Sequence, residues 1–290
     1  MTLLDHANLS FRVEPLAPWQ GPAFEGSMLR GAMGHALRRL VCVMRRPDCT
    51  GCPLIRGCIY TQIFETPPPP GRSAGFVKPP HPFVIDANLF PTSSQRSKVD
   101  FTVRLFGKAL HDAPFVVRAI TEALERGLGS AQQSMRVLEP APDLLGPLTS
   151  EGELDEIPEV ALMRFHTPLR LREGGAQIDV TSLNGPVLGR AILRRVALMA
   201  EFHGRPLEDI AALRAQADQV ILRSSQTNWR RLMRHSSRQK RTHSIGGLVG
   251  EAVVDFTSAP GIRDLARWVP VTHLGKGSSM GLGKIQMEAA

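Results

Sequence analysis

A run of basic and aromatic residues is the clearest chemical feature of the sequence. Residues 219–250 contain no Asp or Glu, and Trp229 and several serines stand among seven cationic side chains. Arginine neutralises phosphates and stacks on bases, and an aromatic ring adds a further stacking surface. A solvated charged face is the ordinary alternative. We predict nucleic-acid binding by Arg230, Arg231, Arg234, Arg238, Lys240, Arg241 and His243.

A glycine-rich stretch near the C-terminus is the second candidate. Four glycines stand within residues 275–283, and glycine lets a backbone approach phosphate oxygens with its amides. The spacing is not that of a P-loop, because Ser278 stands where glycine is needed and Ile285 follows the final lysine. A glycine-rich hairpin turn is the alternative. The predicted phosphate contacts are Gly275, Lys276, Gly277, Ser278, Ser279, Gly281, Gly283 and Lys284.

Four cysteines form the pattern C-x6-C-x2-C-x5-C: Cys42, Cys49, Cys52 and Cys58. Four thiolates suit tetrahedral Zn²⁺, and an iron–sulfur cluster is the second possibility. The alternative is that they are ordinary small apolar residues under a loop. We predict a structural metal site here, since the pattern indicates no open ligand position.

His35 lies in a stretch with the pattern of an amphipathic helix. At about 100° per residue, His35, Gly31, Gly34 and Arg38 fall on the half facing away from the apolar stripe, with Arg30 nearer its border. The two glycines predict a shallow surface that RNA can approach. Imidazole exchanges protons near neutral pH, which suits acid–base chemistry, although a lone helical histidine is commonly a surface or core residue.

Composition agrees with a polyanionic partner. The 35 basic and 27 acidic residues give a formal charge of +8, and 29 of the basic residues are arginine (35 less six lysines). No apolar run approaches the ~18 residues of a membrane span, and the first residues do not resemble a signal peptide. We therefore expect a cytoplasmic protein, where cysteines stay reduced.

The elements that must position these residues follow one order twice. In the first half, hydrophobic periodicity predicts β-α-β-β-α-β, the ferredoxin-like unit. The strands are expected at 9–14, 83–89, 99–106 and 135–138, and the helices at about 27–44 and 113–126. Leu29, Met33, Ala36, Leu37, Leu40 and Met44 form the predicted buried stripe of the first helix.

The second half repeats this order with a doubled helix. Strands are expected at 160–171, 229–233, 248–256, 271–274 and 284–287, and helices at 183–202, 207–223 and 262–268. The predicted fold is α+β, with two tandem ferredoxin-like, RRM-like domains and a C-terminal glycine-rich loop. Their bounds are 1–145 and 159–290, joined by a Pro-, Gly- and acid-rich linker over 146–158.

These motifs together resemble the CRISPR-associated RAMP endoribonucleases that cut precursor crRNA within its repeats, the sixth Cas family. The resemblance covers nearly the whole chain. It is carried by residues 26–35 (GSMLRGAMGH), the cysteines leading into Tyr60 and Phe64-Glu65, 165–171 (FHTPLRL), 237–239 (SRQ), 246–250 (GGLVG) and 275–285 (GKGSSMGLGKI).

The resemblance implies metal-independent cleavage, in which the RNA's own 2′-hydroxyl attacks the adjacent phosphate to give a 2′,3′-cyclic phosphate and a 5′-hydroxyl. It implies His35 as general base or acid, with Arg38 and Arg30 stabilising phosphate charge and His243 or Lys240 as substitutes. The basic patch would grip the repeat, the glycine loop would contact phosphates, and the crRNA would stay bound. Implied partners are repeat RNA and other Cas subunits, in antiviral defence.

Two other functions remain open at this point. One is a RAMP subunit that binds crRNA without cutting it, as a structural part of an interference complex. The other is a zinc-dependent nucleic-acid binder centred on the cysteines. Catalysis by the endoribonuclease that the resemblance implies needs no cofactor. A zinc ion bound by the cysteines would be structural.

Overall fold

A computed structural model describes residues 3–17, 26–68, 79–87, 98–129, 131–139, 154–236 and 241–290. The chain divides into two compact units. Unit 1 comprises Met1–Glu151 with Phe202–Gly204, and unit 2 comprises Gly152–Glu201 with Arg205–Ala290. Most of the linker predicted over residues 146–158 lies outside the described residues. No helix of the described chain is both long and apolar enough to cross a bilayer.

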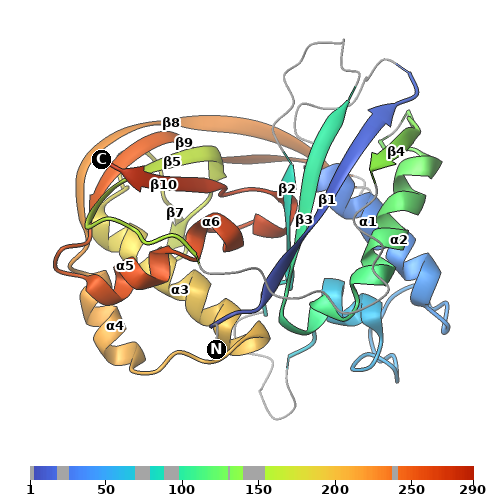
Figure 1. Ribbon diagram of the computed structural model, residues 1–290, viewed down its shortest axis with the longest axis horizontal. Helices are drawn as coiled ribbons and strands as arrows, with labels where there is room; N and C mark the ends of the chain where they lie inside the picture. Colours follow the sequence, from blue (N-terminus) through green and yellow to red (C-terminus); the bar gives the residue numbers. More distant parts are fainter. Residues whose placement is uncertain are drawn as a thin grey trace. The chain divides into compact units, whose positions relative to one another are not determined.

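Unit 1 is an antiparallel sheet with two long helices, in the predicted β-α-β-β-α-β order (Figure 1). The strand order is β2-β3-β1-β4, and each neighbouring pair is antiparallel. Its elements are β1 (His6–Pro15), α1 (Gly26–Val41), the π-helix η1 (Thr61–Glu65), β2 (Phe83–Ala87), β3 (Val99–Phe106), the 3-10 turn η2 (Gly107–Leu110), α2 (Ala113–Arg126) and β4 (Met135–Glu139).

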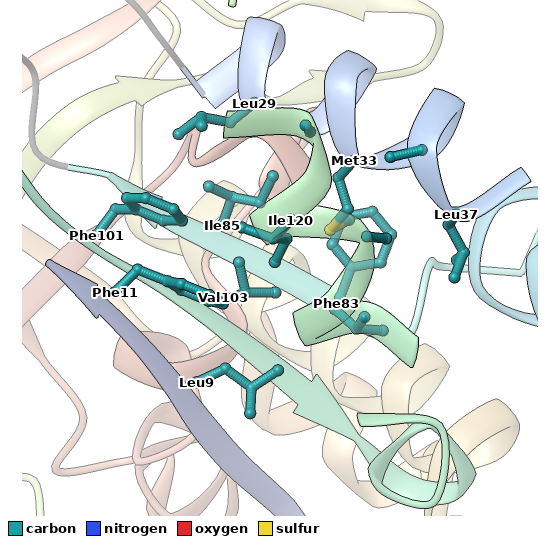
Figure 2. Packing of buried hydrophobic residues seen from close by; sticks show 14 of the residues in the cluster. Leu9, Phe11, Leu29, Met33, Leu37, Phe83, Ile85, Phe101, Val103 and Ile120 are labelled. Carbon is teal, nitrogen blue, oxygen red and sulfur yellow. The ribbon is translucent and has the colours of Figure 1, made fainter. Parts of the chain in front are cut away.

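The core of unit 1 lies between this sheet and the two helices (Figure 2). Alternation along β1 buries Leu9, Phe11 and Val13, since successive strand side chains point to opposite faces. From α1, Leu29, Met33, Ala36 and Leu37 meet them at helical spacing. The predicted stripe is therefore confirmed over its first four positions.

The last two stripe positions are wrong. Leu40 is 41% exposed and Met44 is 44% exposed. The helix ends at Val41, so Met44 falls in the turns that follow it and no longer shares the buried face. Leu40 is still within the helix, in its last turn, and is exposed there.

Unit 2 is a second antiparallel sheet, with the strand order β10-β5-β9-β8. It contains β5 (Val160–Leu169), the short hairpin β6 (Arg172–Glu173) and β7 (Ala176–Gln177), α3 (Gly185–His203), α4 (Ile210–Ala217), β8 (Ile221–Ser236), β9 (Arg241–Asp255), α5 (Pro260–Ala266), α6 (Val269–Thr272), the 3-10 turn η3 (Ser278–Met280) and β10 (Ile285–Ala289). The α+β fold with two ferredoxin-like sheets is confirmed.

Two predicted elements of unit 2 change type. The helix expected over 207–223 ends at Ala217, because β8 begins at Ile221 and pairs with β9 from Ile221↔Asp255 onward. Long-range strand pairing here overrides a helical local pattern. The strand expected over 271–274 is instead the end of α6 and the turn after it, where Pro270 occupies a favoured position in the first helical turn.

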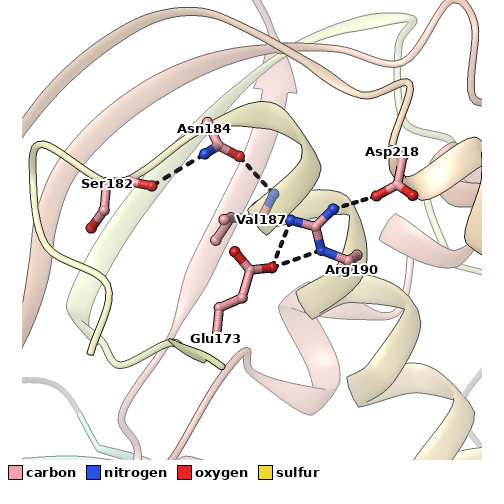
Figure 3. A network of polar contacts seen from close by, with 6 residues as sticks. All are labelled: Glu173, Ser182, Asn184, Val187, Arg190 and Asp218. Carbon is pink, nitrogen blue, oxygen red and sulfur yellow. Dashed lines mark hydrogen bonds and ion pairs between the residues drawn. The ribbon is translucent and has the colours of Figure 1, made fainter. Parts of the chain in front are cut away.

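A polar network ties the β6–β7 hairpin to the start of α3 (Figure 3). Asn184 accepts a hydrogen bond from the backbone N–H of Val187 at 2.9 Å, which caps an otherwise unpaired helix amide. Arg190 binds Glu173 at 2.6 Å and also Asp218. Its guanidinium is thereby committed to two carboxylates within unit 2.

Candidate active site

His35 lies on the exposed surface of α1, as the helical pattern predicted. Its side chain is exposed, and Gly31 one turn earlier is exposed as well. A β-carbon on Gly31 would meet no atom of the described residues within 4 Å. Arg38, one turn after His35, is half-buried. The helix therefore carries an exposed imidazole and, one turn further on, a half-buried arginine, next to an open stretch of backbone.

Gly34 does not belong to this open surface, which corrects the prediction. It is buried, and a β-carbon there would lie 2.9 Å from Cε1 of Phe64. Phe64 comes from η1, and its ring is stacked on Tyr60 with a centroid separation of 5.5 Å. The glycine at position 34 thus makes room for an aromatic pair, and only the Gly31 side of the helix stays open.

The aromatic pair carries an arginine at each end. The Arg30 guanidinium carbon lies 5.3 Å from the centroid of the Phe64 ring, and that of Arg38 lies 5.7 Å from the Tyr60 ring. Arg38 also donates a hydrogen bond to the carbonyl of Arg46. Cation–π contact of this kind orients a guanidinium while leaving N–H groups available. Both predicted phosphate-binding arginines are therefore held against one aromatic surface.

Arg30 has a further partner that sequence reasoning missed. Its Nη2 lies 3.0 Å from Nε2 of His81, whose Nδ1 lies 3.2 Å from the hydroxyl of Thr66. His81 precedes β2 in a proline-rich segment, 51 residues from Arg30. No local periodicity could have found this contact. Tyr60 and Phe64 were part of the recognised motifs, but their spacing gave no indication of a role beside the arginines.

The basic stretch of unit 2 forms a long antiparallel ribbon of β8 and β9 (Figure 1). β8 is the edge strand of its sheet, and Arg230 and Arg231 on it are exposed. Trp229 is 37% exposed, and a β-carbon on Gly246 would lie 2.6 Å from its Nε1. The indole therefore packs on the glycine backbone of β9 and keeps part of its surface open.

Other residues of the predicted basic patch are placed only by their backbone or not at all. Arg234 and His243 are register partners, and Arg241 begins β9. Arg238 and Lys240 lie outside the described residues, so their predicted RNA contacts stay predictions. Arg223, at the other end of β8, binds Asp255 at 2.8 Å.

The glycine-rich loop is wound against its own unit. Gly275, Gly277, Gly281 and Gly283 all have positive φ, between 68° and 89°. A β-carbon on Gly283 would lie 1.8 Å from the carbonyl oxygen of Leu274, so glycine is required for a close backbone approach. Ser278 is buried, whereas Lys276 is exposed.

Thr167 fixes the end of this loop. Its hydroxyl donates to the carbonyl of Gly281 at 2.7 Å and accepts from the backbone N–H of Lys284 at 2.8 Å. The glycines thus allow close backbone contacts within unit 2. Phosphate contact by the loop, through groups such as Lys276, stays a prediction.

Both units match known families. Residues 4–143 match the model AF_1859_N, described as an N-terminal domain. Residues 163–285 match the model described as CRISPR-associated endoribonuclease Cas6. An uncharacterised protein of Archaeoglobus fulgidus is 21% identical over 242 residues, which is 80% of each chain.

Solved structures show a likeness of fold over nearly the whole chain. A product complex of a Thermus thermophilus Cas6 covers 98% of this chain and 99% of its own, at 16% identity and a TM-score of 0.62. Residues 163–285 thus match the Cas6 family, and the fold of the whole chain is similar to that of solved Cas6 and RAMP proteins. A histidine-to-alanine mutant of another Cas6 is similar over 99% of this chain and 100% of its own (18% identity, TM-score 0.53).

A chain from a larger assembly is also similar to this chain. A chain of a partial Cas6-RT-Cas1–Cas2 complex matches over 99% of this chain and 46% of its own, at 13% identity and a TM-score of 0.58. The Cas6-like part of that chain is thus accompanied by further sequence.

The metal site predicted at the four cysteines is not supported. The four cysteines are free and half-buried, and no group of three or more His, Cys, Asp or Glu in the described residues could hold a metal ion. The chain passes through successive hydrogen-bonded turns here, from Cys52 N–H to the Cys49 carbonyl and from Cys58 N–H to the Leu54 carbonyl. Burial also raises the pKa of the Cys49 thiol, against a smaller opposing effect of Arg38.

Proposed function

We propose that this protein is an endoribonuclease that cuts CRISPR repeat RNA in precursor crRNA. The observation that carries the proposal is the exposed His35 on α1, with Arg38 one turn away and Arg30 held on the same aromatic pair. The match of residues 163–285 to an endoribonuclease family and the likeness to an RNA product complex support RNA as the substrate.

The proposed reaction is an internal transesterification. The 2′-oxygen of one nucleotide forms a bond to the adjacent phosphorus while the bond from phosphorus to the 5′-oxygen breaks. The products are a 2′,3′-cyclic phosphate and a 5′-hydroxyl. One proton leaves the 2′-hydroxyl and one reaches the leaving 5′-oxygen, so a single imidazole can serve either transfer.

In this reaction His35 acts as the general base or the general acid. A positioned acid–base group contributes about 10²- to 10⁴-fold in rate. Arg38 and Arg30 stabilise the charge that builds on the non-bridging phosphate oxygens, where preorganised donors act most strongly. That another Cas6 was studied as a histidine-to-alanine mutant supports a histidine in this role.

The rest of the chain serves to hold the RNA. The β8–β9 ribbon, with Arg230 and Arg231, grips the repeat, and the product crRNA stays bound. Other Cas subunits are the proposed protein partners. The similar chain of the partial Cas6-RT-Cas1–Cas2 complex supports this proposal, because that chain is part of such an assembly. The cysteines take no part in the chemistry.

The test uses purified protein in EDTA with a labelled repeat RNA, beside a copy that carries a 2′-deoxy nucleotide upstream of the cut. Cleavage of the first with protection of the second is expected. Cleavage that needs an added divalent ion, or that ignores the 2′-deoxy substitution, would overturn the mechanism. Tight binding without cleavage by folded protein would show a crRNA-binding subunit instead.

A further inference from the structure

His81 directly contacts a proposed catalytic arginine, and the proposed reaction gives it no part. Its Nε2 lies 3.0 Å from Nη2 of Arg30. Its Nδ1 lies 3.2 Å from the Thr66 hydroxyl. Its ring packs on Phe83, with centroids 5.7 Å apart and an interplanar angle of 26°. Contacts at both ring nitrogens and with the Phe83 ring therefore hold the imidazole in place.

The contact with Arg30 determines the tautomer of this imidazole. A guanidinium has only donors, so Nε2 of His81 must accept and must carry no proton. The proton then resides on Nδ1, which donates to the Thr66 hydroxyl. His81 is thus neutral in this arrangement, and its Nε2 is the acceptor for Arg30.

The partners of His81 are themselves held in place. Phe83 is fully buried in the core of unit 1. Thr66 is 8% exposed and ends η1 in a left-handed conformation, with φ at 46°. Such a backbone is unfavourable for a β-branched residue and persists where its surroundings enforce it. Strained residues of this kind gather at functional sites.

We propose that His81 is a positioning residue for Arg30. Its neutral imidazole holds the guanidinium against the Phe64 ring before RNA arrives. Arginine has many rotamers, and a guanidinium ordered in advance loses less freedom when it binds. The inference rests on the proposed function, because it assigns a role within the same site.

The experiment is a double-variant cycle in single-turnover cleavage at saturating RNA. His81→Phe keeps a ring to pack on Phe83 but removes both nitrogens. We expect Arg30→Ala to slow cleavage by about 10²-fold. We expect His81→Phe to slow it by about 10-fold, with the RNA Kd nearly unchanged. The double variant should be no slower than Arg30→Ala alone, since His81 acts through Arg30.

A conservative replacement distinguishes positioning from packing. The side-chain oxygen of glutamine can accept from Arg30 near the place of Nε2, so His81→Gln should recover most of the rate that His81→Phe loses. His111→Gln, at an exposed histidine of unit 1, is the matched control and should cleave like the wild type. If His81→Phe does not fold, Thr66→Val removes only the hydroxyl that sets the tautomer and should slow cleavage several-fold.

The outcomes separate the inference from the function beneath it. Wild-type cleavage by His81→Phe, or losses that add to those of Arg30→Ala, would overturn the positioning role while leaving the nuclease intact. A folded wild type that binds repeat RNA but does not cut it would overturn the proposed function. In that case the same double-variant cycle is measured as the Kd for repeat RNA. Additive losses of affinity would overturn the positioning role, and coupled losses would support it for RNA binding.

Discussion

Phe64 occupies the space that a side chain at Gly34 would need. The gap between a β-carbon at position 34 and Cε1 of Phe64 would be 2.9 Å, closer than such atoms normally approach. The ring cannot move away freely, because it lies against Tyr60 on one side and Phe83 on another, with Arg30 over it. The position of the arginine therefore depends on a glycine one turn further along the helix.

Gly34→Ala should consequently destabilise unit 1 and slow cleavage. Overpacking of this kind costs about 1–3 kcal/mol, and a displaced Phe64 no longer supports Arg30. Gly31→Ala is the matched control, because a β-carbon there meets no described atom within 4 Å. In an exposed helix it should instead stabilise α1 by up to ~1 kcal/mol. Thermal unfolding of the two variants measures both effects, and equal shifts would contradict the packing argument.

Replacing His35 should remove catalysis and spare binding. We expect His35→Ala to lower the single-turnover rate by at least ~10²-fold, since an acid–base group is lost. The fold should be unaffected because the side chain is exposed, and the RNA Kd should change little. His111→Ala serves as a control for loss of an exposed histidine in the same unit. Wild-type cleavage by His35→Ala would reject this residue as the acid or base.

Much of the fold could be predicted because the patterns in the sequence that indicate it are local. Alternation in β1 and the stripe of Leu29, Met33 and Leu37 each report which face is buried, and the order β-α-β-β-α-β follows from such elements. The helix predicted to reach residue 223 was wrong because β8 begins at Ile221, where it pairs with Asp255 at the far end of β9. A window of about 11–18 residues, over which helical periodicity is judged, does not contain both partners.

The candidate site was predictable to a similar extent and for the same reason. His35, Arg30 and Arg38 lie on one helix, so periodicity alone could place them relative to the buried face. His81 joins them from 51 residues away, and Phe64 reaches Gly34 from an irregular π-helix. Cysteine spacing pointed to a metal, but spacing does not determine whether four thiols converge, and here the intervening turns do not bring them together as a metal group.

Unit 2 should show an acid-sensitive contribution from Asp255. Hydrogen bonds from Thr257, followed by those from Arg223, lower the pKa of this carboxyl from 3.8 to about 2. A folded-state pKa below the unfolded value stabilises the fold above about pH 4, and that contribution is lost as the pH falls through the folded pKa.

The measurement compares Asp255→Asn with the wild type by urea denaturation at several pH values. The variant should be less stable at pH 7, and the difference between the two midpoints should shrink as the pH falls from about 4 towards about 2. Asp264→Asn, at an exposed carboxylate of α5, is the control and should show a smaller effect. A difference between the midpoints that does not vary with pH would show that the charge of the Asp255 carboxylate does not stabilise the fold.

The β8–β9 ribbon should account for part of the salt dependence of RNA binding. Each phosphate neutralised contributes about 0.7–0.9 to the slope of log Kd against log salt concentration. Arg230 and Arg231 are exposed neighbours on β8, and neighbouring strand residues point to opposite faces. If RNA contacts both, each single alanine variant should lower the slope by about 0.7–0.9, and the double variant should lower it by the sum. Arg190→Ala removes an arginine already bound to Glu173 and Asp218, so it should leave the slope unchanged (Figure 3). A full loss from one variant and none from the other would place the RNA on a single face of the ribbon and remove the second arginine from the binding site.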